Sequence, residues 1–279
     1  MHTRIKGASA MNTNGAIIYR GPSRLDEKPI VVVVTGLKGS SGNTKTGDLL
    51  QTWILCDEDE APNVALKSGS DYSICGDCKH RRDPETGRRT CYVRMQAPPA
   101  VWKAYRRGSY PDVSGDGAAI AALGNGRKVR LGSYGDPGAV PYEVWSSLVS
   151  EAPGHTGYTH QWNHWNYDAR ISRLCMISAD TETEVRTAEA LGLRAFHVRP
   201  RNAPKPANTA QCPAAAEAGK RVQCADCMLC GGTSVKARSI SIEAHGASAA
   251  FVQINLLLER ALDRIDIVQT DRTTKGART

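Results

Sequence analysis

The sequence lacks any apolar run close to the roughly 20 residues that a membrane-spanning helix needs. The β-branched run Ile30–Val34 covers only a short stretch. The N-terminal residues MHTRIKGASAMNTNG also lack the apolar core of a secretory signal. We therefore expect a cytoplasmic protein with no membrane partner.

The chain has no excess of acidic residues: 36 Lys and Arg face 28 Asp and Glu, which gives a net charge of +8. A basic surplus favours a polyanionic partner, usually nucleic acid. The alternative is an ordinary solvated basic surface. The 279 residues, 41% of them hydrophobic, exclude a fibrous or wholly disordered chain and suffice for a real core without disulfides.

Apolar segments alternate with helical patterns through the middle of the chain. Strands are predicted at 29–35, 49–56, 128–134, 155–160, 173–180, 193–200 and 237–246, and helices at 98–107, 141–152, 181–192 and 249–267. Alternation of this kind predicts an α/β fold with a parallel sheet, either a (β/α) barrel-like sheet, complete or incomplete, or an open doubly wound sheet. We expect a single domain over residues 29–268, preceded by a loose arm (1–28) and followed by a basic tail (269–279). The Gly-rich loop after the first strand does not fit the phosphate-loop pattern, because Thr44 stands where it needs a glycine.

Nine cysteines in a chain without an export signal point to metal binding rather than disulfides. The second cysteine-rich segment, 212–232, carries the strongest pattern. Two-residue gaps let neighbouring thiolates face one ion, and four thiolates suit zinc or an iron–sulfur cluster. The predicted ligands are Cys212, Cys224, Cys227 and Cys230, with His245 as an alternative to Cys212.

The first cysteine-rich segment, 73–93, predicts a second metal site with Cys75, Cys78 and Cys91. Its fourth ligand would be His80 or an external group, because three cysteines with an open position are typical of a catalytic metal. Four arginines flank this segment and are predicted to contact nucleic-acid phosphates: Arg81, Arg82, Arg88 and Arg89. Cys56 and Cys175 lie in apolar strands and are interpreted as small buried hydrophobic residues.

Asp136 and Asp180 each follow a predicted strand, where parallel α/β folds place their active face. They are candidate catalytic carboxylates, although a turn or N-cap role is the plainer interpretation. The segment between them alternates aromatic, imidazole and amide groups, which suits a pocket for a nucleobase. From it and from the next strand we predict catalytic His160 and the substrate-binding residues Tyr158, Gln161, Trp162, His197 and Arg199.

Several motifs resemble an uncharacterised family encoded by bacteriophages and prophages. They are KTGDLLQTWIL (45–55), CGDCKHRR with CYV (75–93), VRLGSYGDPGAVPYEVW (129–145), GYTHQW (157–162) and the late cysteine segment. The resemblance spans about residues 30–246, and it places the protein in the host cytoplasm if a phage encodes it.

The chain is more distantly similar to tRNA-guanine transglycosylases and the phage enzymes that place 7-deazaguanines in DNA. That resemblance implies a (β/α) barrel, two strand-end aspartates and a structural zinc, here on Cys224, Cys227, Cys230 and His245. The spacing is CxxCxxC here where that group has CxCxxC. A second similarity, to radical-SAM-like phage proteins with an early cysteine cluster ending in Cys-Tyr, implies a 4Fe–4S cluster with S-adenosylmethionine.

Three hypotheses remain from the sequence. The leading one is base exchange in nucleic acid, DNA favoured, in which Asp180 attacks the sugar, Asp136 manages protons or recognises the base, and a deazapurine replaces guanine. The second is a radical or redox enzyme with iron–sulfur clusters. The third is a zinc module that binds nucleic acid without turnover, in which case both aspartates are dispensable. The sequence does not fix the oligomeric state.

Overall fold

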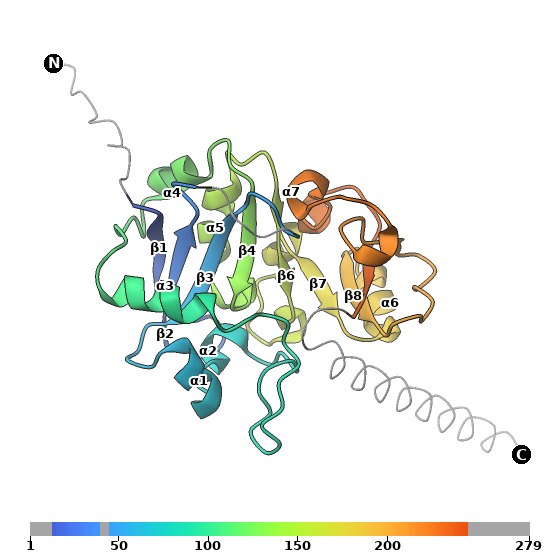
Figure 1. Cartoon of the computed structure of the whole chain (residues 1–279), viewed down its shortest axis with the longest axis horizontal. Helices are drawn as coiled ribbons and strands as arrows, with labels where there is room; N and C mark the ends of the chain where they lie inside the picture. The colour runs from blue at the N-terminus through green and yellow to red at the C-terminus, as the bar shows by residue number, and fades with distance from the viewer. Residues whose placement is uncertain (1–12, 40–44, 245–279) are drawn as a thin grey trace, which may run out of the picture.

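The computed structural model describes residues 13–39 and 45–244, which form a mixed α/β fold with helices around central strands (Figure 1). The strands are β1 (Gly15–Pro22), β2 (Pro29–Thr35), β3 (Leu50–Cys56), β4 (Val129–Tyr134), β5 (His155–Thr156), β6 (Tyr158–Thr159), β7 (Met176–Ala179), β8 (Ala195–Arg199), β9 (Ala210–Gln211) and β10 (Ile240–Glu243). The helices are α1 (Pro62–Ser68), α2 (Tyr72–Cys75), α3 (Ala97–Arg106), α4 (Gly117–Gly124), α5 (Tyr142–Val149), α6 (Glu182–Ala190) and α7 (Cys224–Cys227).

Hydrogen bonds group the strands into two sheets, with the orders β1-β2-β3-β4-β5 and β6-β7-β8-β10-β9. All pairs from β3 onward are parallel, whereas β2 runs antiparallel to both β1 and β3. The edge strands β5 and β6 follow each other in the chain with only Gly157 between them. The first sheet therefore continues into the second through one residue, and the predicted α/β class with parallel strands is confirmed.

The prediction of a loose arm over residues 1–28 is wrong for residues 15–22, which form β1. This strand pairs with β2 from Gly15 opposite Thr35 to Pro22 opposite Pro29. Ala16 and Ile18 are completely buried, so β1 covers the apolar residues of β2. The apolar run within residues 15–22 is short and its neighbours are polar, so the sequence did not predict a strand there. Residues 117–124, for which no helix was predicted, form α4 behind the N-cap Asp116.

The larger hydrophobic core lies around β1–β4 and the helices beside them. Its largest completely buried side chain is Trp145 of α5, whose indole N–H donates to the Pro137 carbonyl at 2.9 Å. A second core joins the strands of the other sheet to Cys212 and Cys230. In the described part of the chain, no helix is long and apolar enough to cross a membrane. The predicted helix 249–267, the basic tail and His245 lie outside the described residues.

Substituting Gly124 by Ala is expected to lower the free energy of unfolding by about 1–3 kcal/mol, the usual cost of overpacking a tight contact. A Cβ atom at Gly124 would stand 2.0 Å from the Leu148 carbonyl oxygen, which would push α4 away from α5. Urea unfolding measures the change. Gly117→Ala is the control in the same helix, because its Cβ would meet only the Ser147 hydroxyl at 3.4 Å. The control should be neutral or stabilising by less than about 1 kcal/mol. Equal losses in both variants would contradict the packing argument.

Candidate functional site

Two histidines and an aspartate meet where β6 and β7 end. His160 directly follows β6, Asp180 directly follows β7, and His80 lies in the loop after α2. Because β6 and β7 are parallel neighbours, their carboxyl ends lie at one edge of the sheet. The ligand atoms of His80, His160 and Asp180 all lie within 4.8 Å of one another, the only such group in the ranges the structure covers. We call this group the carboxylate–histidine cluster.

Asp180 is the centre of this cluster and carries a stable negative charge. Its Oδ1 lies 2.9 Å from His80 Nε2 and 3.7 Å from His160 Nε2, and its Oδ2 lies 3.3 Å from Lys79 Nζ. Burial opposes ionisation of Asp180, but hydrogen bonds from His160 and His80 outweigh it and hold the pKa of this carboxyl well below its usual value. Asp180 is therefore an anion with one oxygen occupied by imidazoles and the other directed at an amine.

Asp136 is buried, and both of its carboxylate oxygens accept hydrogen bonds from neighbouring residues. Oδ1 accepts from the Gly138 N–H at 2.8 Å and the Thr159 hydroxyl at 2.7 Å, and Oδ2 accepts from the His160 N–H at 2.7 Å. Burial raises its pKa, and these hydrogen bonds oppose the rise. Asp136 therefore holds the main chain of His160 in place, the turn and capping role that the sequence left open beside a catalytic one.

Asp136→Asn is expected to cost about 1–3 kcal/mol of unfolding free energy, because the new NH₂ group would face an N–H donor and leave it unsatisfied. Urea unfolding is the measurement. Asp116→Asn is a matched control: Asp116 is an exposed N-cap with one acceptor contact, to Ala119 N–H at 2.9 Å, and Asn caps a helix about as well. An Asp136→Asn midpoint as close to wild type as that of the control would refute the positioning role.

The three cysteines of the first segment, Cys75, Cys78 and Cys91, form the early cysteine set, and the structure brings them to the same edge of the sheet. Each interacts electrostatically with the others. Cys75 ends α2, and the Cys78 N–H donates to its carbonyl at 3.2 Å. The Cys91 N–H donates to the His80 carbonyl at 3.0 Å. The set is wider than the carboxylate–histidine cluster, since its sulfur atoms do not all lie within 4.8 Å.

Gln161, predicted to bind substrate, instead binds the loop of the early cysteine set. Its amide Nε2 donates to the Cys75 carbonyl at 2.8 Å, and its Oε1 accepts from the Asp77 N–H at 3.3 Å. Gly76 makes this approach possible, because a Cβ there would stand 2.1 Å from Gln161 Oε1. Gln161 is 1% exposed and is therefore closed to a ligand in this structure.

The other predicted substrate-binding residues are spread over the second sheet. Tyr158 packs on Phe196 with ring centroids 4.7 Å apart and hydrogen-bonds to Cys230, away from Asp180. Trp162 packs against the core under α6. His197 is nearer the cluster: its Nδ1 lies 2.9 Å from the carbonyl of Ala179, the residue before Asp180.

Arg199 and the four arginines of the first segment differ in the number of contacts that their guanidinium groups make within the protein. Arg199 is buried and pairs with Glu243 at 3.1 Å. Arg81 binds Asp71 and two main-chain carbonyls, and Arg89 donates to the Val93 carbonyl at 2.9 Å. Arg82 lies over the half-buried Gly87, and Arg88 is exposed. The predicted phosphate contacts of Arg81 and Arg89 would therefore compete with contacts that shape the loop.

Cys212, Cys224, Cys227 and Cys230 form the late cysteine set, and all four interact electrostatically with one another. Cys224 and Cys227 lie on α7, whose first N–H groups donate to the carbonyls of Lys45 and Thr46. Burial raises the pKa of Cys230 to about 12, so its thiol keeps its proton unless a cation takes the proton's place. Burial also raises the pKa of the Cys224 thiol, and Arg130 and Lys45 oppose the rise. Four thiols are a donor set for zinc or an iron–sulfur cluster, but no three of these sulfur atoms lie within 4.8 Å of one another.

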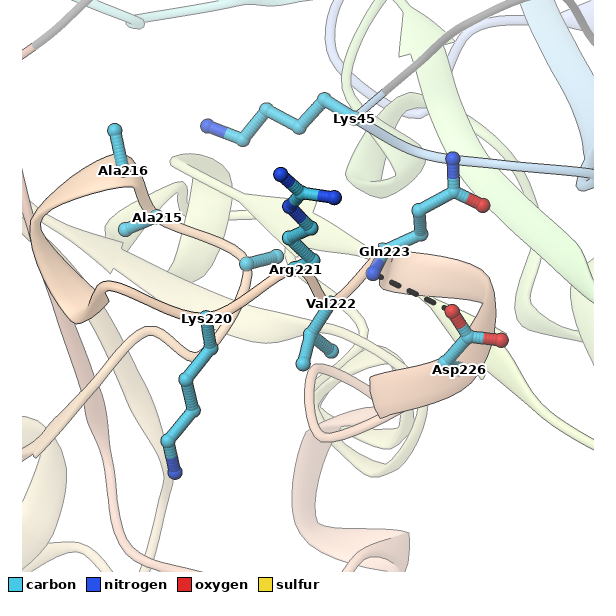
Figure 2. A pocket seen from close by; sticks show the side chains of 9 residues that line it. Lys45, Ala215, Ala216, Lys220, Arg221, Val222, Gln223 and Asp226 are labelled. Atoms are coloured by element: carbon cyan, nitrogen blue, oxygen red, sulfur yellow. Dashed lines mark hydrogen bonds between the residues drawn. The ribbon is translucent and has the colours of Figure 1, made fainter.

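A cavity of about 660 Å³ is lined by Lys45 and by residues between 214 and 226, the stretch of chain that carries Cys224 (Figure 2). No residue of the carboxylate–histidine cluster lines it. Three cations line it, Lys45, Lys220 and Arg221, against one acid, Asp226, whose carboxylate accepts from the Gln223 N–H at 3.4 Å. Lys220 and Arg221 are exposed. The balance of charge suits an anionic group rather than a cation.

Sequence reasoning missed Lys79, Thr90 and Glu184 as parts of the site. Lys79 lies beside Asp180, and Thr90 Oγ1 lies 2.8 Å from His80 Nδ1. Glu184 forms a capping box with Thr181 at the start of the predicted helix 181–192, and it also accepts from the Asp180 N–H at 2.6 Å. Only the capping box left a sequence signal, because the other contacts depend on how the loop after α2 packs against the end of β7.

The comparisons with known proteins give no relatives: no family model matches the chain, and neither a curated protein nor a solved structure matches it.

Proposed function

We propose that the protein modifies nucleic acid, DNA by preference, by exchanging guanine for a 7-deazaguanine through a covalent bond to Asp180. The observation that carries this proposal is the buried, ionised carboxylate of Asp180 at the carboxyl edge of a parallel sheet. Its Oδ1 is held by imidazoles, while Oδ2 faces Lys79, whose side chain is 41% exposed. An anion held in this way is suited to nucleophilic attack on a sugar carbon.

The exchange has two balanced steps. Asp180 Oδ2 bonds to the sugar C1′ as the glycosidic C1′–N9 bond breaks, and the departing guanine takes the proton that His80 Nε2 shares with Asp180. The incoming deazapurine then attacks C1′ with its N9, the ester C1′–O bond breaks, and the N9 proton returns to His80. Loss of charge on Asp180 during the first step weakens its hold on the His80 proton, which favours the transfer.

The charge of the molecule supports a nucleic-acid partner. The net charge is +8, and the basic cavity offers Lys45, Lys220 and Arg221 to phosphates. We propose a cytoplasmic location together with this partner. A barrel-like closure of the two sheets would bring their carboxyl ends around one site, as this chemistry requires. Zinc on the late cysteine set would supply a cross-link between α7 and the Cys212 segment.

Asp180→Asn is expected to abolish a DNA adduct that survives denaturing electrophoresis, because the amide is neutral and a poor nucleophile. The assay uses end-labelled guanine-containing DNA without an acceptor base, followed by mass spectrometry of nucleosides after a 7-deazaguanine is added. Asp59→Asn is the control, since the Asp59 side chain is 93% exposed and contacts only Arg106 among described residues. An adduct of equal yield with Asp180→Asn would exclude this residue as the nucleophile.

A second candidate, an iron–sulfur enzyme, is favoured by one observation: the early cysteine set reaches the sheet edge that carries Asp180. Three thiolates could hold a cluster with one open iron, which would supply redox or radical chemistry. Protein purified without oxygen decides between the candidates. A colourless protein with zinc is expected from base exchange. A brown protein with iron and sulfide would replace base exchange by the second candidate.

A further inference from the structure

His160 and the early cysteine set lie together although 69 to 85 residues separate them in the chain. Gln161, the next residue, clamps the loop that joins Cys75 to Cys78, with contacts at 2.8 and 3.3 Å to the carbonyl of Cys75 and the N–H of Asp77. The side chains of Cys78 and His160 are hydrogen-bonded to each other. Cys91 is attached from the other side through its 3.0 Å bond to the His80 carbonyl. The Cys78 and Cys91 side chains therefore lie near the imidazole of His160, and Cys75 lies near both thiols.

His80, the fourth ligand that sequence spacing offers, is already occupied. Its Nδ1 lies 2.8 Å from Thr90 Oγ1 and its Nε2 lies 2.9 Å from Asp180 Oδ1. An imidazole has only these two nitrogens, so His80 would have to give up a hydrogen bond in order to bind a metal. His160 has Nε2 toward Asp180, at 3.7 Å, and a side-chain contact with Cys78. It is the better placed of the two histidines.

The position of Asp180 beside His160 resembles that of a carboxylate that orients a metal-bound histidine. Histidines that bind metals nearly always use one ring nitrogen for the ion and give the other N–H to a carboxylate or carbonyl. The ring of His80 packs edge-on against that of His160, with centroids 5.3 Å apart, and closes the remaining side. The main chain of His160 is fixed by Asp136 at 2.7 Å. Position, orientation and backbone of this imidazole are therefore all determined.

We propose that Cys75, Cys78, Cys91 and His160 form a closed four-ligand site for one zinc ion, with Asp180 as the residue that orients His160. Three thiolates and an imidazole are a donor set for a borderline-soft divalent ion that prefers tetrahedral coordination. The sulfur atoms are more widely spaced than the carboxylate–histidine cluster, so zinc binding draws the loop inward around Gly76, which already has a φ of +51°. The site does not depend on the base-exchange chemistry, because it uses neither Asp180 Oδ2 nor a nucleic acid.

The test counts metal and then measures how tightly it is held. Full-length protein is expected to carry two zinc ions per chain, one for each cysteine set. Cys78→Ser and Cys91→Ser should each carry one. Cys175→Ala, which removes a buried thiol outside both sets, should keep two. Cobalt substitution then reports the thiolates through their charge-transfer absorption, and the difference between wild type and Cys91→Ser is the spectrum of the early site.

Competition with a chromophoric chelator separates the two histidines. His160→Ala should weaken zinc binding at the early site at least tenfold, and Asp180→Asn by about 10–100-fold, the usual effect of losing a group that orients a ligand. His80→Gln should change it less than either. Circular dichroism restricts the comparison to variants that remain folded, and Cys91→Ser replaces Cys78→Ser if the latter does not fold.

Three results would overturn this assignment. One is a wild-type stoichiometry of a single zinc that the Cys78→Ser and Cys91→Ser variants retain. Another is loss of the early zinc in His80→Gln but not in His160→Ala, which would make His80 the ligand. The third is iron with sulfide at the early set. Each is separable from the fate of base exchange, because metal content is measured without DNA and on cysteine and histidine variants that keep Asp180.

Discussion

The buried carboxylate of Asp136 connects the two sheets at the edge where the candidate site lies. Asp136 follows β4 of the first sheet. It accepts from the hydroxyl of Thr159, the last residue of β6 in the second sheet, and from the N–H of the next residue, His160. A carboxylate that accepts three hydrogen bonds tolerates burial, whereas an unsatisfied one is costly. Every feature of the site that involves His160 or Gln161 depends on this connection, since both residues leave β6 directly after it.

His160 lies at the centre of the site, and several residues contact its backbone and its ring. Asp136 fixes its backbone, Asp180 and His80 face its ring, and Gln161 brings the early cysteine set against it. Burial works against a charged imidazole here, but the charges of Cys78 and Asp180 outweigh it and raise the pKa of His160 well above its usual value. The same proximity that stabilises the charge also brings soft donors near His160, so the proposed nucleophile and the proposed metal site lie side by side.

Patterns among neighbouring residues predicted the strands, helix ends and turns that depend only on those residues. The β-branched run of β2, the capping box at Thr181 and the strand-end position of Asp180 were all readable from neighbouring residues. The sequence could not predict which distant residue each side chain of one segment would contact. Gln161 and Tyr158 belong to one polar, aromatic segment, yet Gln161 binds the Cys75 loop and Tyr158 binds Cys230. Their different roles come from tertiary packing, which one sequence does not encode as a spacing.

The two cysteine sets form separate groups of contacts beside β4. Near the start of this strand, Lys128 Nζ donates to the Ala225 carbonyl in α7, and Arg130 interacts with Cys224 of the late set. At its end, Tyr134 interacts with Cys75 of the early set. The cysteines that influence each thiol belong to its own set. The late set therefore lies with the segment around the basic cavity, while the early set lies beside the buried carboxylate of Asp180. Chemistry at the site is expected to depend on the early set, and the late set to affect it only through stability.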